Sequence, residues 1–416
     1  MKTSHSTRAR LSQAWLALAA IATVVGCGGG GGDAQIEPFD SFQGYVVADF
    51  DGDGRNDLAA TVSHIAEAPP HPGHVRVWLQ RHDLPGSFLP ATHYDTATDP
   101  AQLVHADVDG DGLPDLIAVS HAPGNTVNDT ITWLRADPAS PGHFVSGGTL
   151  HAGSRIAQVA VRDLDLDGHP DIALSTYSEH PGVAVMWGSA TAAGQFSSPV
   201  YMATGAATGE VTVQDVNGDG RLDLLWAEEA AIRLALHDPL AARGFLPPVT
   251  VASGLHTTFL VAADFDRDGW PDLAFGDRDT TDMGAPGVLV TLRNDPAAPG
   301  RFVAWQRHPL AVHSFAALVA DMNRDGLPDL VIAEPNYRGI SEDMFEVFMN
   351  TAAGWQAPVQ NPFELIDAYS AAAGDLDGDG WPDVVASAMG ANQGKLAWMR
   401  QDPARLGKLL APVMID

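Results

Sequence analysis

Residues 107–115 read Asp-Val-Asp-Gly-Asp-Gly-Leu-Pro-Asp, and the pattern Asp-x-(Asp/Asn)-x-Asp-Gly-x-x-Asp occurs seven times in this chain of 416 residues. The intervals between copies are 49 to 58 residues, and the copies begin at Asp49, Asp107, Asp163, Asp215, Asp264, Asp321 and Asp375. A repeat of roughly fifty residues that runs through a whole chain is typical of propellers, solenoids and other arrays. The repeat therefore has to be interpreted before any single motif.

Each copy offers a set of oxygen ligands that suits Ca²⁺. Side-chain oxygens at positions 1, 3, 5 and 9 and the main-chain carbonyl of position 7 can surround one ion, and glycine at position 6 permits a sharp bend. No soft ligand is present, so zinc and copper are not expected. The predicted ligands are Asp49, Asp51, Asp53, Arg55, Asp57; Asp107, Asp109, Asp111, Leu113, Asp115; Asp163, Asp165, Asp167, His169, Asp171; Asp215, Asn217, Asp219, Arg221, Asp223; Asp264, Asp266, Asp268, Trp270, Asp272; Asp321, Asn323, Asp325, Leu327, Asp329; and Asp375, Asp377, Asp379, Trp381, Asp383.

The alternative is that these residues only form turns or a solvated charged face. Positions 1, 3, 5 and 9 hold 26 Asp and two Asn, and 26 is half of the 52 acidic residues in the chain. So many carboxylates at such short range repel strongly without a cation, which favours up to seven structural Ca²⁺ ions. An EF-hand is excluded because the twelfth residue of each copy is apolar instead of Glu. The copies with Asn217 and Asn323 have one carboxylate fewer, and we expect them to bind more weakly.

Short apolar stretches flank each copy and indicate buried β-strands. Residues 259–263 precede one copy, and residues 330–333 follow another. Each unit then contains a third strand, a polar turn that often begins with Asp-Pro, and a weaker fourth strand. Four recurrent tryptophans of the third strands are expected in the core between units: Trp78, Trp133, Trp187 and Trp398. Seven units of four antiparallel strands predict an all-β, seven-bladed β-propeller over residues 41–416.

These repeats resemble the FG-GAP or VCBS repeat family, whose blades also form the head domains of integrin α-chains. The resemblance covers nearly all of residues 41–416 and implies a calcium-binding propeller. Its motif is specific to the fold and only weakly specific to function. For ring closure, we expect the segment 36–39 to add an edge strand to the last unit near residues 409–415.

The order of strands predicts two unlike faces. Up-and-down blades place the calcium loops and the Asp-Pro turns on one face, and the remaining connections on the other. Those remaining connections differ in length, from the pair Glu228-Glu229 to the segments 64–74, 121–129, 277–287 and 334–343. Variable loops on a rigid scaffold often carry function. We therefore predict that a carbohydrate or protein ligand binds on the face opposite the calcium loops.

The N-terminus has the pattern of an exported bacterial lipoprotein. Arg8 and Arg10 precede the apolar run 11–25, which is too short for a confident membrane span and fits a signal peptide. The following Val-Val-Gly-Cys resembles a lipobox and ends in Cys27, the only cysteine. We predict a signal peptide over residues 1–26 and a lipidated Cys27 with a Gly-rich tether over 27–40. Attachment through lipid alone, to the outer membrane of the cell envelope, is favoured over secretion as a soluble protein.

The net charge limits the classes of partner that the protein can bind, and the cysteine content limits how its fold can be stabilised. The formal net charge is −29, and removal of residues 1–26 takes away Lys2, Arg8 and Arg10, which leaves −29 − 3 = −32. Such an acidic protein repels nucleic acid and anionic lipid surfaces. A single cysteine forms no intramolecular disulfide, so Ca²⁺ has to brace the exported fold.

No catalytic residues are predicted, because the chain lacks metalloprotease, serine-hydrolase and phosphate-loop motifs and has no cysteine nucleophile. The histidines that we would mutate first are His105, His256 and His313, near the expected channel mouth; His64, His71 and His74 lie together in one unit. A non-enzymatic surface binding module is the preferred function. The alternatives are a sugar-active enzyme, such as a polysaccharide lyase or hydrolase, and a structural component of the envelope. Fold analogy does not choose among them.

Overall fold

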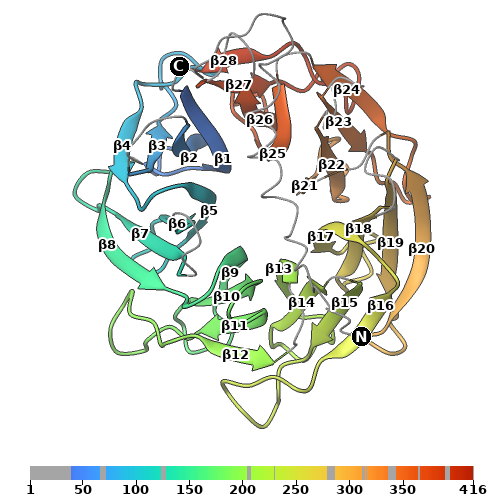
Figure 1. Cartoon of the computed structure of the whole chain (residues 1–416). Coiled ribbons are helices and arrows are strands. Elements are labelled where there is room, and N and C mark those ends of the chain that lie inside the picture. Colours follow the sequence, from blue (N-terminus) through green and yellow to red (C-terminus); the bar gives the residue numbers. More distant parts are fainter. Residues whose placement is uncertain are drawn as a thin grey trace, which may run out of the picture.

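The computed structural model describes residues 39–65, 72–122, 128–203, 208–228, 230–278, 286–311, 314, 316–335, 343–363, 366–388 and 394–415. Within these residues the regular structure consists of 28 strands and no helix. The strands form seven four-stranded antiparallel sheets, each built from four consecutive strands, and the sheets are arranged as blades around a central channel (Figure 1). The predicted seven-bladed β-propeller is confirmed.

The blades follow one another along the chain. Blade 1 contains β1 (Phe39–Ala48), β2 (Asp57–Ile65), β3 (His74–Trp78) and β4 (Thr92–Asp95); blade 2 contains β5 (Pro100–Ala106), β6 (Asp115–Ser120), β7 (Thr130–Ala136) and β8 (Phe144–His151); blade 3 contains β9 (Ile156–Arg162), β10 (Asp171–Thr176), β11 (Gly182–Met186) and β12 (Val200–Ala203). Blade 4 contains β13 (Thr208–Gln214), β14 (Asp223–Glu228), β15 (Ala231–Ala235) and β16 (Val249–Ser253); blade 5 contains β17 (Thr257–Ala263), β18 (Asp272–Asp277), β19 (Val288–Asn294) and β20 (Phe302–Pro309). Blade 6 contains β21 (Ala316–Ala320), β22 (Asp329–Glu334), β23 (Asp343–Phe348) and β24 (Val359–Phe363); blade 7 contains β25 (Ile366–Gly374), β26 (Asp383–Ala388), β27 (Leu396–Met399) and β28 (Val413–Ile415).

The hydrophobic core lies between blades. Second strands such as β6, β10 and β14 are buried at every residue, because both of their faces are covered by neighbouring blades. The buried apolar side chains fall into seven clusters, and each cluster joins two adjacent blades. The four tryptophans predicted in the inter-blade core are buried there, as expected: Trp78, Trp133, Trp187 and Trp398.

The ring closes differently from our expectation. Phe39 pairs with Ile65 inside blade 1, and blade 7 has its own fourth strand in β28, which pairs with β27. The predicted mixed blade is therefore wrong, because blade 7 leaves no position for a strand from the N-terminus; residues 36–38 lie outside the described residues. The seam between blades 1 and 7 is held by an apolar cluster that contains Trp78 and Trp398.

Hydrogen bonds also cross this seam. The Gln80 side-chain amide donates to the carbonyl of Leu376 over 2.6 Å, and the Asn56 amide donates to the carbonyl of Asp375 over 3.0 Å. Comparable amide bridges to the loop of the preceding blade start from Asn294 and Asn350. Gln401 of blade 7 makes the same kind of bridge to the carbonyl of Met322, so the seam uses the same kind of contact as three other blade interfaces.

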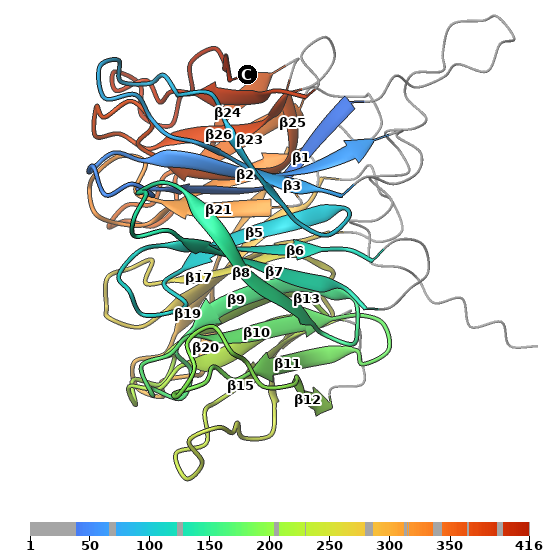
Figure 2. The same ribbon diagram turned by 90° about the vertical axis from the view of Figure 1, so that its left-hand side faces the viewer.

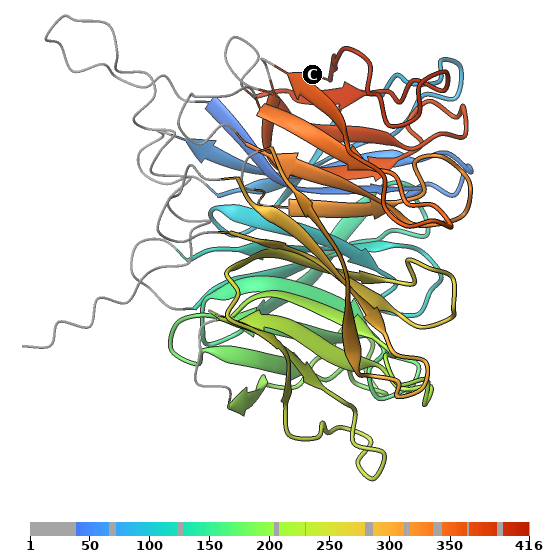
Figure 3. The same ribbon diagram turned by 90° about the vertical axis from the view of Figure 1, so that its right-hand side faces the viewer.

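The two faces are arranged as predicted. The turns between third and fourth strands lie against the acidic loop of the preceding blade: Gly142 donates its backbone N–H to the carbonyl of Phe50 over 3.1 Å. Side views show strands that run between the two faces of the ring (Figures 2 and 3). Most of the variable connections assigned to the opposite face lie outside the described residues, namely 66–71, 123–127, 279–285 and 336–342, together with Glu229.

Candidate metal centres

Each acidic loop is ordered by its own backbone. The seven copies of the motif form loops 1 to 7, numbered in chain order from residues 49–57. In loop 1, Oδ1 of Asp49 accepts the backbone N–H groups of Gly52 (2.7 Å) and Asp53 (3.1 Å), and Oδ2 accepts that of Gly54 (2.8 Å). The glycine at position 6 has a φ of +80° to +92° in all seven loops, which explains why glycine recurs there. The first aspartate therefore holds the bend through hydrogen bonds that do not require a bound cation.

Five loops bring three carboxylates together. One oxygen of each lies within 4.8 Å of the others in the groups Asp49, Asp51, Asp53; Asp107, Asp109, Asp111; Asp163, Asp165, Asp171; Asp264, Asp266, Asp272; and Asp375, Asp377, Asp383. An all-oxygen set of this charge fits Ca²⁺. In the described residues, the loops with Asn217 and Asn323 form no such three-carboxylate group, consistent with weaker sites. The main-chain carbonyls of position 7 stay predicted ligands.

Mutual repulsion is visible in the titration of these groups. Burial, and then the negative charge of Asp53, raise the pKa of Asp51. Burial and the charge of Asp268 likewise raise the pKa of Asp266. A divalent cation beside these carboxylates would reverse the effect, because it favours their charged form. The loops are therefore compatible with Ca²⁺ binding in geometry, donor type and charge.

The ninth-position aspartates have a role that the motif alone did not reveal. Asp115 is fully buried, and its Oδ1 accepts the N–H of Ala136 (2.7 Å) while Oδ2 accepts the N–H of Val108 (3.0 Å) and the indole N–H of Trp133 (3.0 Å). In all seven blades the ninth carboxylate accepts a backbone N–H from the last residue of the third strand or from a residue shortly after it. It thus ties the loop, the second strand and the third strand together.

Burial dominates the titration of these ninth-position carboxyls. It raises the pKa of Asp57, Asp272, Asp329 and Asp383 to about 7 and that of Asp115, Asp171 and Asp223 to about 6, although backbone hydrogen bonds oppose the shift. Each carboxyl therefore depends on its hydrogen bonds, and on any nearby cation, to remain charged in the interior.

Neighbouring loops also contact one another directly. Arg267, at position 4 of loop 5, donates to the carbonyls of Asp325 (2.7 Å) and Gly326 (2.8 Å) in loop 6. Arg324, at position 4 of loop 6, lies 5.3 Å from the ring centroid of Trp381 in loop 7. Both arginines have φ near +58°, which costs about 1 kcal/mol relative to glycine. Position 4 is glycine in four other loops. The arginine at this position in loops 5 and 6 was the feature of the sequence from which these contacts could have been predicted.

The predicted cluster of His64 and His74 is present on strands β2 and β3 of blade 1. The rings of His64 and His74 are 5.0 Å apart, and His74 stacks on His93 at 4.9 Å. Arg76 donates to Nε2 of His74 over 3.2 Å, and Asp40 accepts from both Arg76 and His64. Three rings packed in this way, with Arg76 among them, link strands β2, β3 and β4 of blade 1; His71 lies outside the described residues.

Acidification is expected to weaken this part of blade 1 through His74. Burial, and then the charge of Arg76 and the neighbouring His93 and His64, lower its pKa from 6.5 to about 4, whereas Asp40 opposes the shift. Asp95 faces His74 across β3 and β4. Because the folded pKa lies below the unfolded one, the neutral form stabilises the fold above pH 6.5, and that stability is lost as the pH falls from 6.5 towards 4.

The measurement is urea unfolding at pH 7 and pH 4.5 with Ca²⁺ held constant. Relative to His74→Asn, the unmodified chain should lose about 2 kcal/mol more between the two pH values. The matched control is His82→Asn, in an exposed turn of the same blade, which should follow the unmodified chain. An identical pH dependence for His74→Asn and the unmodified chain would contradict this account.

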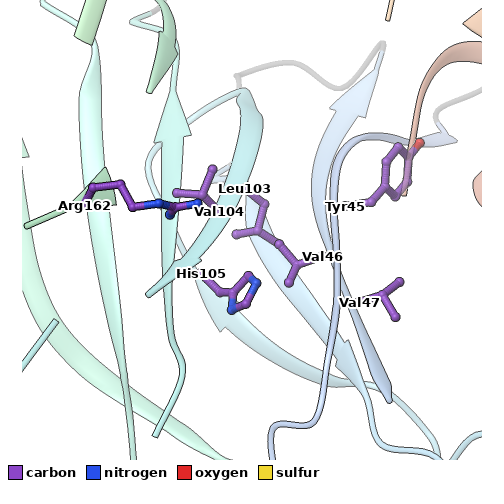
Figure 4. Close-up of a pocket in the computed structure, with 7 residues that line it drawn as sticks. All are labelled: Tyr45, Val46, Val47, Leu103, Val104, His105 and Arg162. Atoms are coloured by element: carbon purple, nitrogen blue, oxygen red, sulfur yellow. The ribbon is translucent and has the colours of Figure 1, made fainter. Parts of the chain in front are cut away.

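A cavity of about 310 Å³ opens on the innermost strands β1, β5 and β9, and Tyr45, Val46, Val47, Leu103, Val104, His105 and Arg162 line it (Figure 4). Burial, and then the charge of Arg162, lower the pKa of His105. His105 precedes the first aspartate of loop 2 by two residues, so this part of the channel belongs to the calcium-loop face. His256 donates its backbone N–H to Asp277 over 3.0 Å, and His313 lies outside the described residues.

The fold and the loops together define a β-propeller built from Asp-rich repeats. The model of the FG-GAP-like repeat matches residues 49–118, 107–174, 163–226, 215–275 and 321–386, so all seven loops and more than half of the chain are matched. The chain belongs to the FG-GAP-like repeat family, as its sequence predicts.

Two human proteins are similar to this chain in sequence. Integrin alpha-IIb (Homo sapiens) is 28% identical over 190 residues, which cover 44% of this chain and 15% of the integrin. Integrin alpha-7 (Homo sapiens) is 30% identical over 121 residues, which cover 26% of this chain and 10% of the integrin. The chain thus spans only a small part of these relatives' lengths.

Two solved structures are similar to this chain. A protein from Lactobacillus plantarum superposes with a TM-score of 0.54 at 15% identity and covers 86% of this chain and 96% of its own. The exotype rhamnogalacturonan lyase YesX superposes with a TM-score of 0.49 at 15% identity, covering 93% of this chain and 67% of its own. At such identity the likeness concerns the fold alone.

The described part of the chain contains no helix with the length and apolar character needed to cross a membrane. The predicted signal peptide, Cys27 and residues 28–38 of the predicted tether lie outside the described residues, whereas residues 39–40, also assigned to the tether, belong to β1. Their assignment stays a prediction from the sequence.

Proposed function

We propose that this chain is a calcium-stabilised propeller of the bacterial cell envelope that acts as a non-enzymatic binding module for a carbohydrate or protein. The observation that carries the proposal is the group of three convergent carboxylates in each of five loops on one face of the ring. Metal bound there would pin the innermost hairpins and leave the opposite face for recognition.

The distribution of perturbed acids supports binding over catalysis. An active site gathers perturbed groups in one cleft, whereas here the ninth-position aspartates with raised pKa values occupy seven equivalent positions around the ring and accept backbone hydrogen bonds. Glu210, on the innermost strand β13, lies outside the repeated motif, and burial raises its pKa to about 7. Glu210 is accordingly the residue with which the enzymatic alternative can be tested.

We place the protein at the membrane through lipid on Cys27, with the outer membrane as the favoured destination. The support is the lipobox-like sequence before Cys27 and the glycine-rich tether after it. Acyl chains on one cysteine anchor a protein firmly without a spanning helix. Cys27→Ala should therefore move the protein from the membrane fraction to the soluble fraction of its bacterial host; retention of Cys27→Ala in the membrane fraction would refute lipid anchoring.

The test of function is a glycan and protein array probed with the full chain in Ca²⁺ and in chelator, alongside a turnover assay on polysaccharides. We expect selective binding in Ca²⁺, loss of binding in chelator, and equal binding by Glu210→Gln. Polysaccharide cleavage that disappears in Glu210→Gln would instead establish the sugar-active enzyme. If the chain binds neither glycans nor proteins and cleaves no polysaccharide, the proposed binding function is wrong, and the protein is instead a structural component of the envelope.

A further inference from the structure

Loop 3, residues 163–171, differs from the other described loops because an arginine of the neighbouring blade contacts two of its carboxylates. Arg243 lies in the turn between β15 and β16 of blade 4, and its Nε lies 2.5 Å from Oδ2 of Asp165. Its Nη2 lies 3.1 Å from Oδ2 of Asp167 and donates to the carbonyl of Gly188 over 3.0 Å. One guanidinium therefore bridges two predicted metal ligands and the end of the third strand of blade 3.

The oxygens that Arg243 occupies are those that a metal ion would need. Oδ1 of Asp165 accepts the backbone N–H of Asp167 (3.1 Å), and Oδ1 of Asp167 accepts that of His169 (2.9 Å). The loop's own backbone thus uses the Oδ1 atoms and leaves both Oδ2 atoms for a cation. Arg243 takes both, with two donors of a planar fork that matches a pair of carboxylates.

Other loops have weaker versions of this contact. In three of them an arginine of the same blade approaches a single position-3 carboxylate: Arg135 lies 3.5 Å from Asp109, Arg293 lies 3.0 Å from Asp266, and Arg400 lies 3.5 Å from Asp377. In loop 1, Arg55 contacts only Asp53. A single pair leaves the other Oδ2 accessible to metal, whereas the contact of Arg243 with Asp165 and Asp167 closes both.

We propose that Arg243 is a built-in counter-cation that holds loop 3 in place of a metal ion and competes with Ca²⁺ for its oxygens. This inference rests on the proposed calcium binding of the other loops. Loop 3 would then be the weakest of the five three-carboxylate sites and would stay folded when Ca²⁺ is scarce. The junction of blades 3 and 4 becomes the part of the ring that depends least on metal.

The test compares Arg243→Gln with Arg405→Gln. Arg405 occupies the corresponding turn of blade 7 but pairs with Asp402 of its own turn over 2.9 Å, so it serves as a matched control. Native mass spectrometry of the full chain at stepwise Ca²⁺ concentrations counts bound ions. Arg243→Gln should gain one ion at about tenfold lower Ca²⁺ than the unmodified chain, the size expected from losing two half-exposed ion pairs. The additional Asp163→Ala substitution should abolish that ion, and Arg405→Gln should change nothing.

Thermal unfolding supplies an independent readout and shows whether each variant folds. In chelator, Arg243→Gln should melt below the unmodified chain, and saturating Ca²⁺ should remove the difference. Equal ion counts and equal melting of Arg243→Gln and the unmodified chain, with ions bound to the other loops, would overturn the role of Arg243 alone. An unmodified chain that binds no Ca²⁺ would overturn the proposed metal function as well.

Discussion

Removal of Ca²⁺ is expected to lower the melting temperature of this chain by on the order of 10 °C. With dissociation constants on the order of 10⁻⁴ to 10⁻³ M, each filled loop contributes about 1.4–2.7 kcal/mol in about 10 mM free Ca²⁺. The four three-carboxylate loops that Arg243 does not contact, which begin at Asp49, Asp107, Asp264 and Asp375, then contribute on the order of 6–11 kcal/mol. The entropy of unfolding for a chain of this size is about 0.8 kcal/mol per kelvin, which converts that sum into the expected shift.

Calorimetry in excess Ca²⁺ and in excess chelator measures this effect. Mg²⁺ is the control ion, because it demands a small octahedral shell that keeps several waters, and we expect it to restore less than half of the shift. Melting that is unchanged by chelator, or fully restored by Mg²⁺, would show that the loops are not calcium sites of structural importance.

Replacement of Asp115 by Ala is expected to cost on the order of 4 kcal/mol even without metal. The substitution leaves three donors unpaired, namely the backbone N–H groups of Val108 and Ala136 and the indole N–H of Trp133. Unpaired buried donors cost about 1–3 kcal/mol each. The predicted consequence is loss of the junction between loop 2 and the third strand of blade 2.

Urea unfolding in chelator separates this role from metal ligation. The matched control is Asp111→Ala in the same loop, because Asp111 is an exposed predicted ligand whose Oδ1 accepts only the backbone N–H of Leu113. In chelator, Asp111→Ala should cost less than about 1 kcal/mol, whereas in Ca²⁺ both variants should be destabilised. Equal costs for the two variants in chelator would refute the structural role of Asp115.

The repeated loop motif was sufficient to predict the blades, their number and the face that the loops share. Those features depend on local chemistry, since positions 1 and 6 shape the bend and apolar runs on either side form buried strands. Contacts between blades were not predictable in the same way. The bridge from Arg243 to Asp165 spans 78 residues, and the spacing of the motif carries no information about it.

Ring closure and the ninth aspartate show the same limit. The sequence predicts a mixed blade because it leaves open whether the last unit has its own fourth strand, and residues 413–415 supply that strand. Position 9 was assigned to the metal alone because hydrogen bonds from the third strand become visible only when the sheet is assembled. The position 4 arginines, by contrast, carried a readable signal, since a side chain replaced glycine where φ is positive.

Anomalous scattering from crystals grown in Ca²⁺ tests the central claim most directly. We predict a ring of seven blades with anomalous peaks inside at least the four three-carboxylate loops that begin at Asp49, Asp107, Asp264 and Asp375, and a weaker peak or none beside Arg243. Loops without peaks in a fully formed ring would contradict the account, because the carboxylates would then be held together without a metal ion.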